Sequence, residues 1–108
     1  MATVIRQPAI TAAIQGTLKA DRKTKDLVKR LRPGDIALIH HCDLDSMAAR
    51  ALVECRVAAV VNAVHSVSGR YPNSGPGILL EAGIPLIDAV GDTFFEADIA
   101  RTFEAARL

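Results

Sequence analysis

Residues 35–63 read DIALIHHCDLDSMAARALVECRVAAVVNA, and this stretch decides the fold class. Ile36 to Ile39 form a short apolar run between a turn signal and a polar cluster, which predicts a buried strand. Met47 to Cys55 place apolar residues at helical spacing. Val57 to Val61 form a second apolar and largely β-branched run, which predicts another buried strand. Strand, helix and strand in succession are typical of an α/β fold with a parallel sheet.

The same alternation continues on both sides of this stretch. Upstream, an amphipathic helix is predicted from Asp21, closed by Pro33 and Gly34. Downstream, a short helix is predicted over residues 78–82 and a strand over residues 84–90. A last helix is predicted over residues 93–106, with the apolar side chains of Phe94, Phe95, Ile99 and Phe103 facing inward. Residues 1–20 alternate weakly, which predicts an N-terminal arm or edge strand ahead of a single α/β domain over residues 21–108.

Composition supports one small domain. Of the 108 residues 50% are hydrophobic, but only 4% are aromatic and none is tryptophan, so the core is expected to be aliphatic, as in buried parallel strands. No apolar run reaches the ~20 residues of a membrane span, and the N-terminus does not resemble a signal peptide. Two cysteines without a CxxC spacing are expected to be reduced thiols. We therefore expect a cytoplasmic protein.

Charge is distributed unevenly along the chain. Residues 1–35 hold eight basic and three acidic residues, a net charge of +5, which leaves −4 for the remainder because the total is +1. This asymmetry indicates an anionic partner, self-association or contact with a neighbouring domain, although a solvated helix face has the same pattern. The low total makes nucleic-acid binding an unfavoured hypothesis.

Polar clusters follow three predicted strands, at residues 40–45, 62–76 and 88–92. Ligands of open α/β sheets bind beyond the carboxyl ends of the strands, so we expect these clusters to lie together. Residues 66–76 read SVSGRYPNSGP, in which glycine N–H groups and Arg70 are able to receive a phosphate or carboxylate. An ordinary tight turn requires the same residue types.

Other candidate residues have equally good structural explanations. Asp43 and Asp45 are paired carboxylates suited to Mg²⁺, but Asp43 is also explained as a helix cap and Asp45 as a first-turn residue. His40, His41, Cys42 and His65 lack a recognised metal-site spacing, so no metal site and no catalytic residue are predicted. The predicted ligand-binding residues are Asp43, Asp45, Asn62, Ser66, Ser68, Gly69, Arg70, Tyr71, Asn73 and Asp88.

Several short motifs together carry a resemblance to a known family. They are DRKTKDL at 21–27, RPGDIA at 32–37, DLD at 43–45, VN at 61–62, SGRYPN at 68–73, GP at 75–76, AGIPLID at 82–88 and VG at 90–91. In this respect the chain resembles the N-terminal domain of the cytokinetic-ring protein SteA family over roughly residues 16–95. Members of that family carry a following domain similar to thiamine pyrophosphokinases and hydrophobic C-terminal segments, which this sequence does not contain.

A fainter resemblance links the glycine-rich loop and the following AGIP to the swivelling phosphohistidine domain of phosphoenolpyruvate-utilising enzymes. It implies a swivelling β/β/α-like layout, whereas the threonine-serine-histidine site of that family is not present. The SteA resemblance implies a role in bacterial cell division through protein partners, and with the polar loop it favours a non-catalytic binding or assembly module without a cofactor. A small domain with an edge strand near its N-terminus tends to hide that edge, so we expect a homodimer or other oligomer. The alternative is an accessory domain of a phosphoryl or diphosphoryl transfer enzyme, which binds a phosphate-containing ligand or Mg²⁺.

Overall fold

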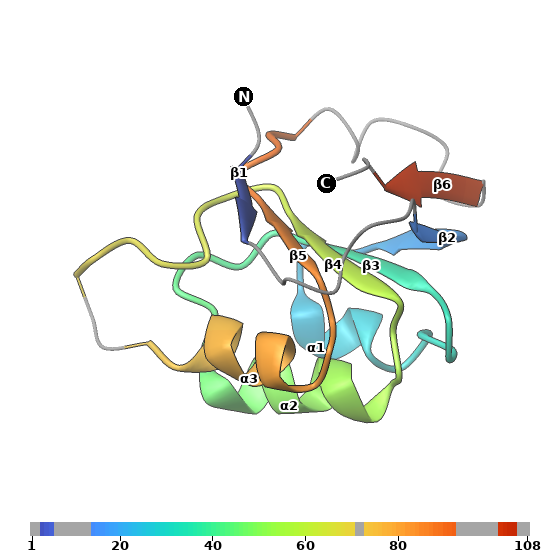
Figure 1. Cartoon of the computed structure of the whole chain (residues 1–108), viewed down its shortest axis with the longest axis horizontal. Coiled ribbons are helices and arrows are strands. Elements are labelled where there is room, and N and C mark those ends of the chain that lie inside the picture. Colours follow the sequence, from blue (N-terminus) through green and yellow to red (C-terminus); the bar gives the residue numbers. More distant parts are fainter. Residues whose placement is uncertain (1–2, 6–13, 71–72, 93–101, 106–108) are drawn as a thin grey trace.

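A computed structural model describes residues 3–5, 14–70, 73–92 and 102–105 of the chain, which form a six-stranded sheet with helices (Figure 1). The strand order is β1-β5-β4-β3-β2-β6. The four central strands, β2 to β5, are parallel, and β1 and β6 pair antiparallel at the two ends of the order. The strands are β1 (Thr3–Ile5), β2 (Ile14–Ala20), β3 (Ile36–Ile39), β4 (Ala59–Asn62), β5 (Leu86–Asp88) and β6 (Thr102–Ala105).

Three helices connect the parallel strands in chain order. They are α1 (Thr24–Leu27), α2 (Ser46–Glu54) and α3 (Gly75–Glu81), and all three lie on the same face of the sheet (Figure 1). Each new parallel strand adds beside the one before it, so crossovers of the usual right hand place every helix on one side. The prediction of a small α/β fold with a mainly parallel sheet and flanking helices is confirmed. No helix in the described part of the chain is long and apolar enough to cross a membrane.

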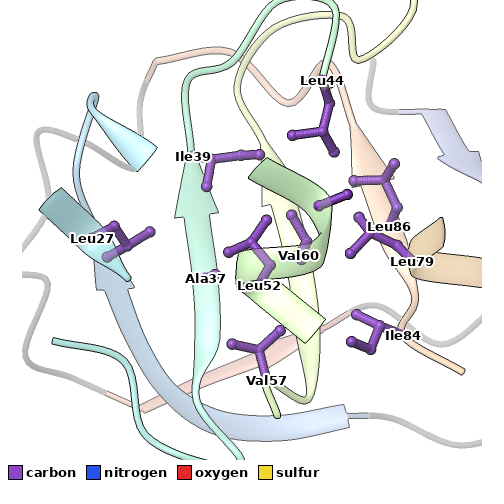
Figure 2. Packing of buried hydrophobic residues seen from close by; sticks show 11 residues of the cluster. Leu27, Ala37, Ile39, Leu44, Leu52, Val57, Val60, Leu79, Ile84 and Leu86 are labelled. Atoms are coloured by element: carbon purple, nitrogen blue, oxygen red, sulfur yellow. The ribbon is translucent and has the colours of Figure 1, made fainter. Parts of the chain in front are cut away.

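The period of two along each strand divides the core between the two faces of the sheet. Toward the helices, Ala37, Ile39, Val60 and Leu86 pack against Leu52 and other helix residues (Figure 2). On the opposite face the strands bury a second aliphatic cluster, which comprises Leu18, Ala20, Ile36, Leu38, Ala59, Val61 and Ile87. The expectation of an aliphatic core is therefore confirmed within the described residues.

The start of α2 corrects the predicted helix cap. Asp45, not Asp43, is the N-cap residue, and its carboxylate accepts a hydrogen bond of 2.8 Å from the backbone N–H of Ala48. Asp43 has a positive φ of 56° and lies two residues before the cap. Both aspartates precede the apolar stripe, so local spacing did not distinguish between them. The helix predicted from Asp21 is confirmed only as the four residues of α1.

The two ends of the chain also differ from the predictions. Thr102–Ala105 is strand β6, so the prediction of a helix there is wrong, while residues 93–101 and 106 lie outside the described residues. The reason is non-local pairing, because Ile14–Thr17 of β2 pairs with β6 and only Leu18–Ala20 pairs with β3. Within residues 1–20, β1 lies at the edge of the sheet as expected, whereas β2 lies between β3 and β6.

Candidate functional site

The loops that follow β3, β4 and β5 meet at the carboxyl edge of the sheet. The N–H groups of Asp43 and Leu44 donate to the carbonyls of His65 and Ser66, at 3.2 and 2.9 Å. The N–H of Gly91 donates to the carbonyl of Ala63 at 3.0 Å. These backbone bonds join the three polar clusters of the sequence, so their predicted convergence is confirmed.

Asn62, the last residue of β4, links two of these loops. Its side-chain oxygen accepts from the N–H of His41 at 3.1 Å, and its Nδ2 donates to the carbonyl of the same residue at 2.9 Å. Nδ2 also donates to Ser66 Oγ at 2.7 Å. The side chain of Asn62 is fully buried, so its polar atoms depend on these bonds because water cannot reach them. Asn62 therefore fixes His41 and Ser66 relative to the sheet.

Ser66 and Asp88 extend this buried network to β5. The carboxylate of Asp88 accepts from the backbone N–H of Ser66 at 3.0 and 3.1 Å and from its hydroxyl at 2.7 Å. Ser66 is fully buried and Asp88 is only 7% exposed. The network of Asn62, Ser66 and Asp88, here called the buried scaffold, has its polar atoms paired within the protein. It holds Ser66, the first residue of the 66–76 loop, in place, and a ligand at the surface would not touch it directly.

Asp43 and Ser68 form the exposed counterpart of the scaffold. The carboxylate of Asp43 accepts from the N–H of Ser68 at 2.7 Å and from its hydroxyl at 2.8 Å. The backbone bond, then the hydroxyl bond, hold the pKa of Asp43 below its ordinary value, with smaller contributions from Cys42 and the nearby Arg70 guanidinium. Asp43 thus stays ionised and occupies the donors that an external anion would use.

Arg70 lies exposed beside this pair, and its backbone N–H donates to Ser68 Oγ at 3.2 Å. No carboxylate of the described residues lies within 4 Å of its guanidinium. Arg70, Ser68 and Asp43 open into a cavity of about 630 Å³, here called the rim cavity. It is lined by Cys42, Asp43, Val64, His65, Val67, Ser68 and Arg70. The cavity therefore presents one fixed anion, one cation with free hydrogen-bonding capacity, and apolar walls.

The remaining predicted site residues lie apart from the rim cavity or support it. Asp45 caps α2, and its carboxylate lies 3.5 Å from His41 Nε2. Gly69 has a φ of +86°, a left-handed conformation that favours glycine. Asn73 donates from Nδ2 to the carbonyl of Ser66 and accepts from the N–H of Gly75, so that N–H is not open to a phosphate as the sequence had suggested. Tyr71 lies outside the described residues.

Sequence reasoning missed the contact between Thr24 and His41. Thr24 Oγ1 lies 2.9 Å from His41 Nδ1, although 17 positions separate the two residues. No local motif indicates such a pair, because it depends on α1 folding back over the end of β3. In the described part of the chain no group of three or more His, Cys, Asp or Glu residues is arranged to hold a metal ion.

No family model matches this sequence, and no curated protein matches it either. The geometry of the carboxyl edge, with the sequence resemblance described above, therefore carries the functional proposal.

The link between Asp43 and Ser68 predicts a specific titration behaviour. Because the pKa of Asp43 is lowered in the folded state, its contribution to stability is present at neutral pH and is lost as pH falls through the folded-state pKa. Ser68→Ala removes the hydroxyl but keeps the backbone donor, so we expect the pKa of Asp43 to rise part of the way toward 3.8. Arg70→Ala removes a smaller contribution, so the rise should be smaller. Carbon-13 NMR titration of the carboxyl group measures both, and equal pKa values in all three proteins would contradict the geometry.

Proposed function

We propose that this chain is a non-catalytic binding or assembly module of a SteA-like bacterial cell-division protein, acting in the cytoplasm. The observation that carries the proposal is that half-buried Asp43 and exposed Arg70 lie together at the rim cavity, above a scaffold whose buried polar groups are paired. A carboxylate held in place by Ser68, beside an exposed guanidinium and above a base whose polar groups are paired, is suited to recognition.

The charges at the rim cavity define the ligand that fits. Asp43 already occupies the N–H and hydroxyl of Ser68, so an incoming phosphate or carboxylate is received by Arg70. The ionised Asp43 beside it repels a second negative charge and favours a donor such as an ammonium or hydroxyl group. The proposed ligand is therefore a phosphate- or carboxylate-bearing group with a neighbouring positive or donor group, as found on a protein partner or a small zwitterion.

Assembly through the sheet edges forms the second part of the proposal. Strands β1 and β6 lie at the two ends of the sheet, with three and four residues respectively. An edge strand has unpaired backbone groups on its outer side, and pairing with a second copy satisfies them. We propose a homodimer formed in this way, which would present two rim cavities to a partner in the division apparatus.

Arg70→Ala tests the recognition part of the proposal, with Arg50→Ala, an exposed position on α2, as the matched loss of one positive charge. Titration with O-phosphoserine, which carries a phosphate and an ammonium group, is expected to shift the NMR amide signals of residues 68–70. Loss of the Arg70 contacts should weaken binding roughly tenfold or more, and Arg50→Ala should change it less than about twofold.

Two results would contradict this function. One is identical O-phosphoserine affinity for the wild type and Arg70→Ala. The other is a molecular mass by light scattering, at micromolar concentration, that corresponds to a monomer alone, which would remove the proposed assembly.

A further inference from the structure

A second cavity of about 400 Å³ lies at the carboxyl ends of β2 and β3, on the other side of Cys42 from the rim cavity. It is lined by Arg22, Lys23, Thr24, Lys25, His40, His41 and Cys42, and is here called the basic cavity. Among the described residues, Cys42 alone lines both cavities. Two segments that are distant in the sequence, residues 22–25 and 40–42, form the basic cavity. They follow β2 and β3, which are neighbouring parallel strands, so the two segments meet at the same edge of the sheet.

The lining of the basic cavity carries a concentrated positive charge. Arg22, Lys23 and Lys25 contribute three basic side chains, two histidines lie beside them, and none of the lining residues that the structure describes is acidic. Within the described residues, no carboxylate lies within 4 Å of the ammonium group of Lys23 or Lys25. Cations that share one cavity repel each other, and a bound anion offsets this repulsion because it attracts each of them.

Two aspartates near this cavity, Asp21 and Asp92, already interact with basic or backbone groups of the protein. Asp21 accepts from the backbone N–H of Lys23 at 3.0 Å and lies 3.6 Å from the guanidinium of Arg30. Exposed Asp92 lies 3.7 Å from Arg22 Nη1 and 3.4 Å from His40 Nε2. Asp92 therefore pairs with two residues that line the cavity, and an anion bound there would compete with it for them.

The floor of the basic cavity is fixed by buried contacts. Thr24 is only 7% exposed and its hydroxyl oxygen lies 2.9 Å from His41 Nδ1, while Asp45 lies on the far side of the same ring. The backbone of His41 is bonded in both directions to the fully buried Asn62. The imidazole and the hydroxyl are thus positioned before any ligand arrives, which reduces the entropy lost on binding.

We propose that the basic cavity binds a compact phosphate polyanion, of the size and charge of pyrophosphate or the terminal phosphates of a nucleotide. Three permanent cations match a ligand with several negative charges better than a singly charged carboxylate. An extended nucleic acid fits poorly, because the cavity is a single hollow and the part of the chain beyond residue 35 has a net charge of −4. This site goes beyond the proposed function, because apart from Cys42 it is lined by different residues, and it takes a ligand without a positive group.

The test uses inorganic pyrophosphate and the full chain, with calorimetry for affinity and NMR for position. The site variant is Lys23→Ala with Lys25→Ala, and the matched control is Lys29→Ala with Arg50→Ala, two exposed positions that do not line the cavity. We expect the site variant to weaken pyrophosphate binding about tenfold or more and the control less than about threefold. Asp92→Asn should strengthen binding, because it removes the competing carboxylate.

NMR shifts separate this proposal from that for the rim cavity. Pyrophosphate is expected to shift the amide signals of residues 22–25 and 40–42 and to bind Arg70→Ala as well as the wild type. Equal weakening by the site variant and the control would overturn the proposal, since it would mark a non-specific charge effect. Shifts confined to residues 68–70, or tighter binding of a single-stranded DNA oligonucleotide than of pyrophosphate at 0.15 M salt, would overturn it as well.

Discussion

Replacing Asn62 with alanine is expected to lower the free energy of unfolding by about 3 kcal/mol or more. The side chain is fully buried and bonds the backbone N–H and carbonyl of His41 as well as Ser66 Oγ. Alanine leaves these groups without partners in a place that water does not reach, and each such group costs about 1–3 kcal/mol. Urea unfolding followed by circular dichroism measures the loss.

Two further variants separate hydrogen bonding from packing at this position. Asn62→Asp keeps the volume but turns an oxygen toward the carbonyl of His41, where Asn62 has its Nδ2 donor, so we expect a loss comparable with that of alanine. Asn73→Ala, in the loop that follows β4 and only half-buried, removes two bonds nearer the surface and should cost about 1 kcal/mol. A loss below about 1 kcal/mol for both Asn62 variants would contradict the role of the buried scaffold.

The central elements were predictable because their signals are local. The run from Ile36 to Ile39 is observed as β3 with the predicted bounds, since a short apolar run between turn residues has few alternatives to a buried strand. The end of helix α3 at Glu81, just before Gly83, was equally predictable, because a glycine at a positive φ commonly ends a helix. Periodicity and turn chemistry alone therefore identified the α/β order from β3 to β5.

Features that depend on residues far apart in the sequence could not be predicted from local patterns. Phe103 fits a helical spacing, yet it lies in β6 opposite Gly16 of β2, a partner 87 positions away. The sequence favoured Asp43 as the cap and Asp45 as a first-turn residue, but Asp45 is the cap, and Asp43 instead binds Ser68, 25 positions along the chain. Likewise, the composition of the 66–76 loop predicted a polar site at the sheet edge, but not that Asn62, Ser66 and Asp88 lie buried beneath it.

Gly75→Ala is expected to destabilise the protein by about 2–3 kcal/mol, because the added methyl group meets backbone. Gly75 is buried at the start of α3, and a Cβ there would collide with the carbonyl oxygen of Leu44 and lie 2.9 Å from that of Asp45. These atoms belong to the segment that caps α2, so they are not free to move aside as a side-chain tip would. Urea unfolding again measures the change.

Gly77→Ala is the matched control, two residues further along the same helix. A Cβ at Gly77 meets nothing within 4 Å, so the helix preference of alanine should raise stability by about 0.5–1 kcal/mol. Because Gly75 packs on the segment that follows Asp43, its replacement should also disturb the bonds from Ser68 and raise the pKa of Asp43, whereas Gly77→Ala should leave that pKa unchanged. Equal stability of the two variants would show that α3 does not pack closely on the start of α2, and the rim cavity would then lose its rigid base.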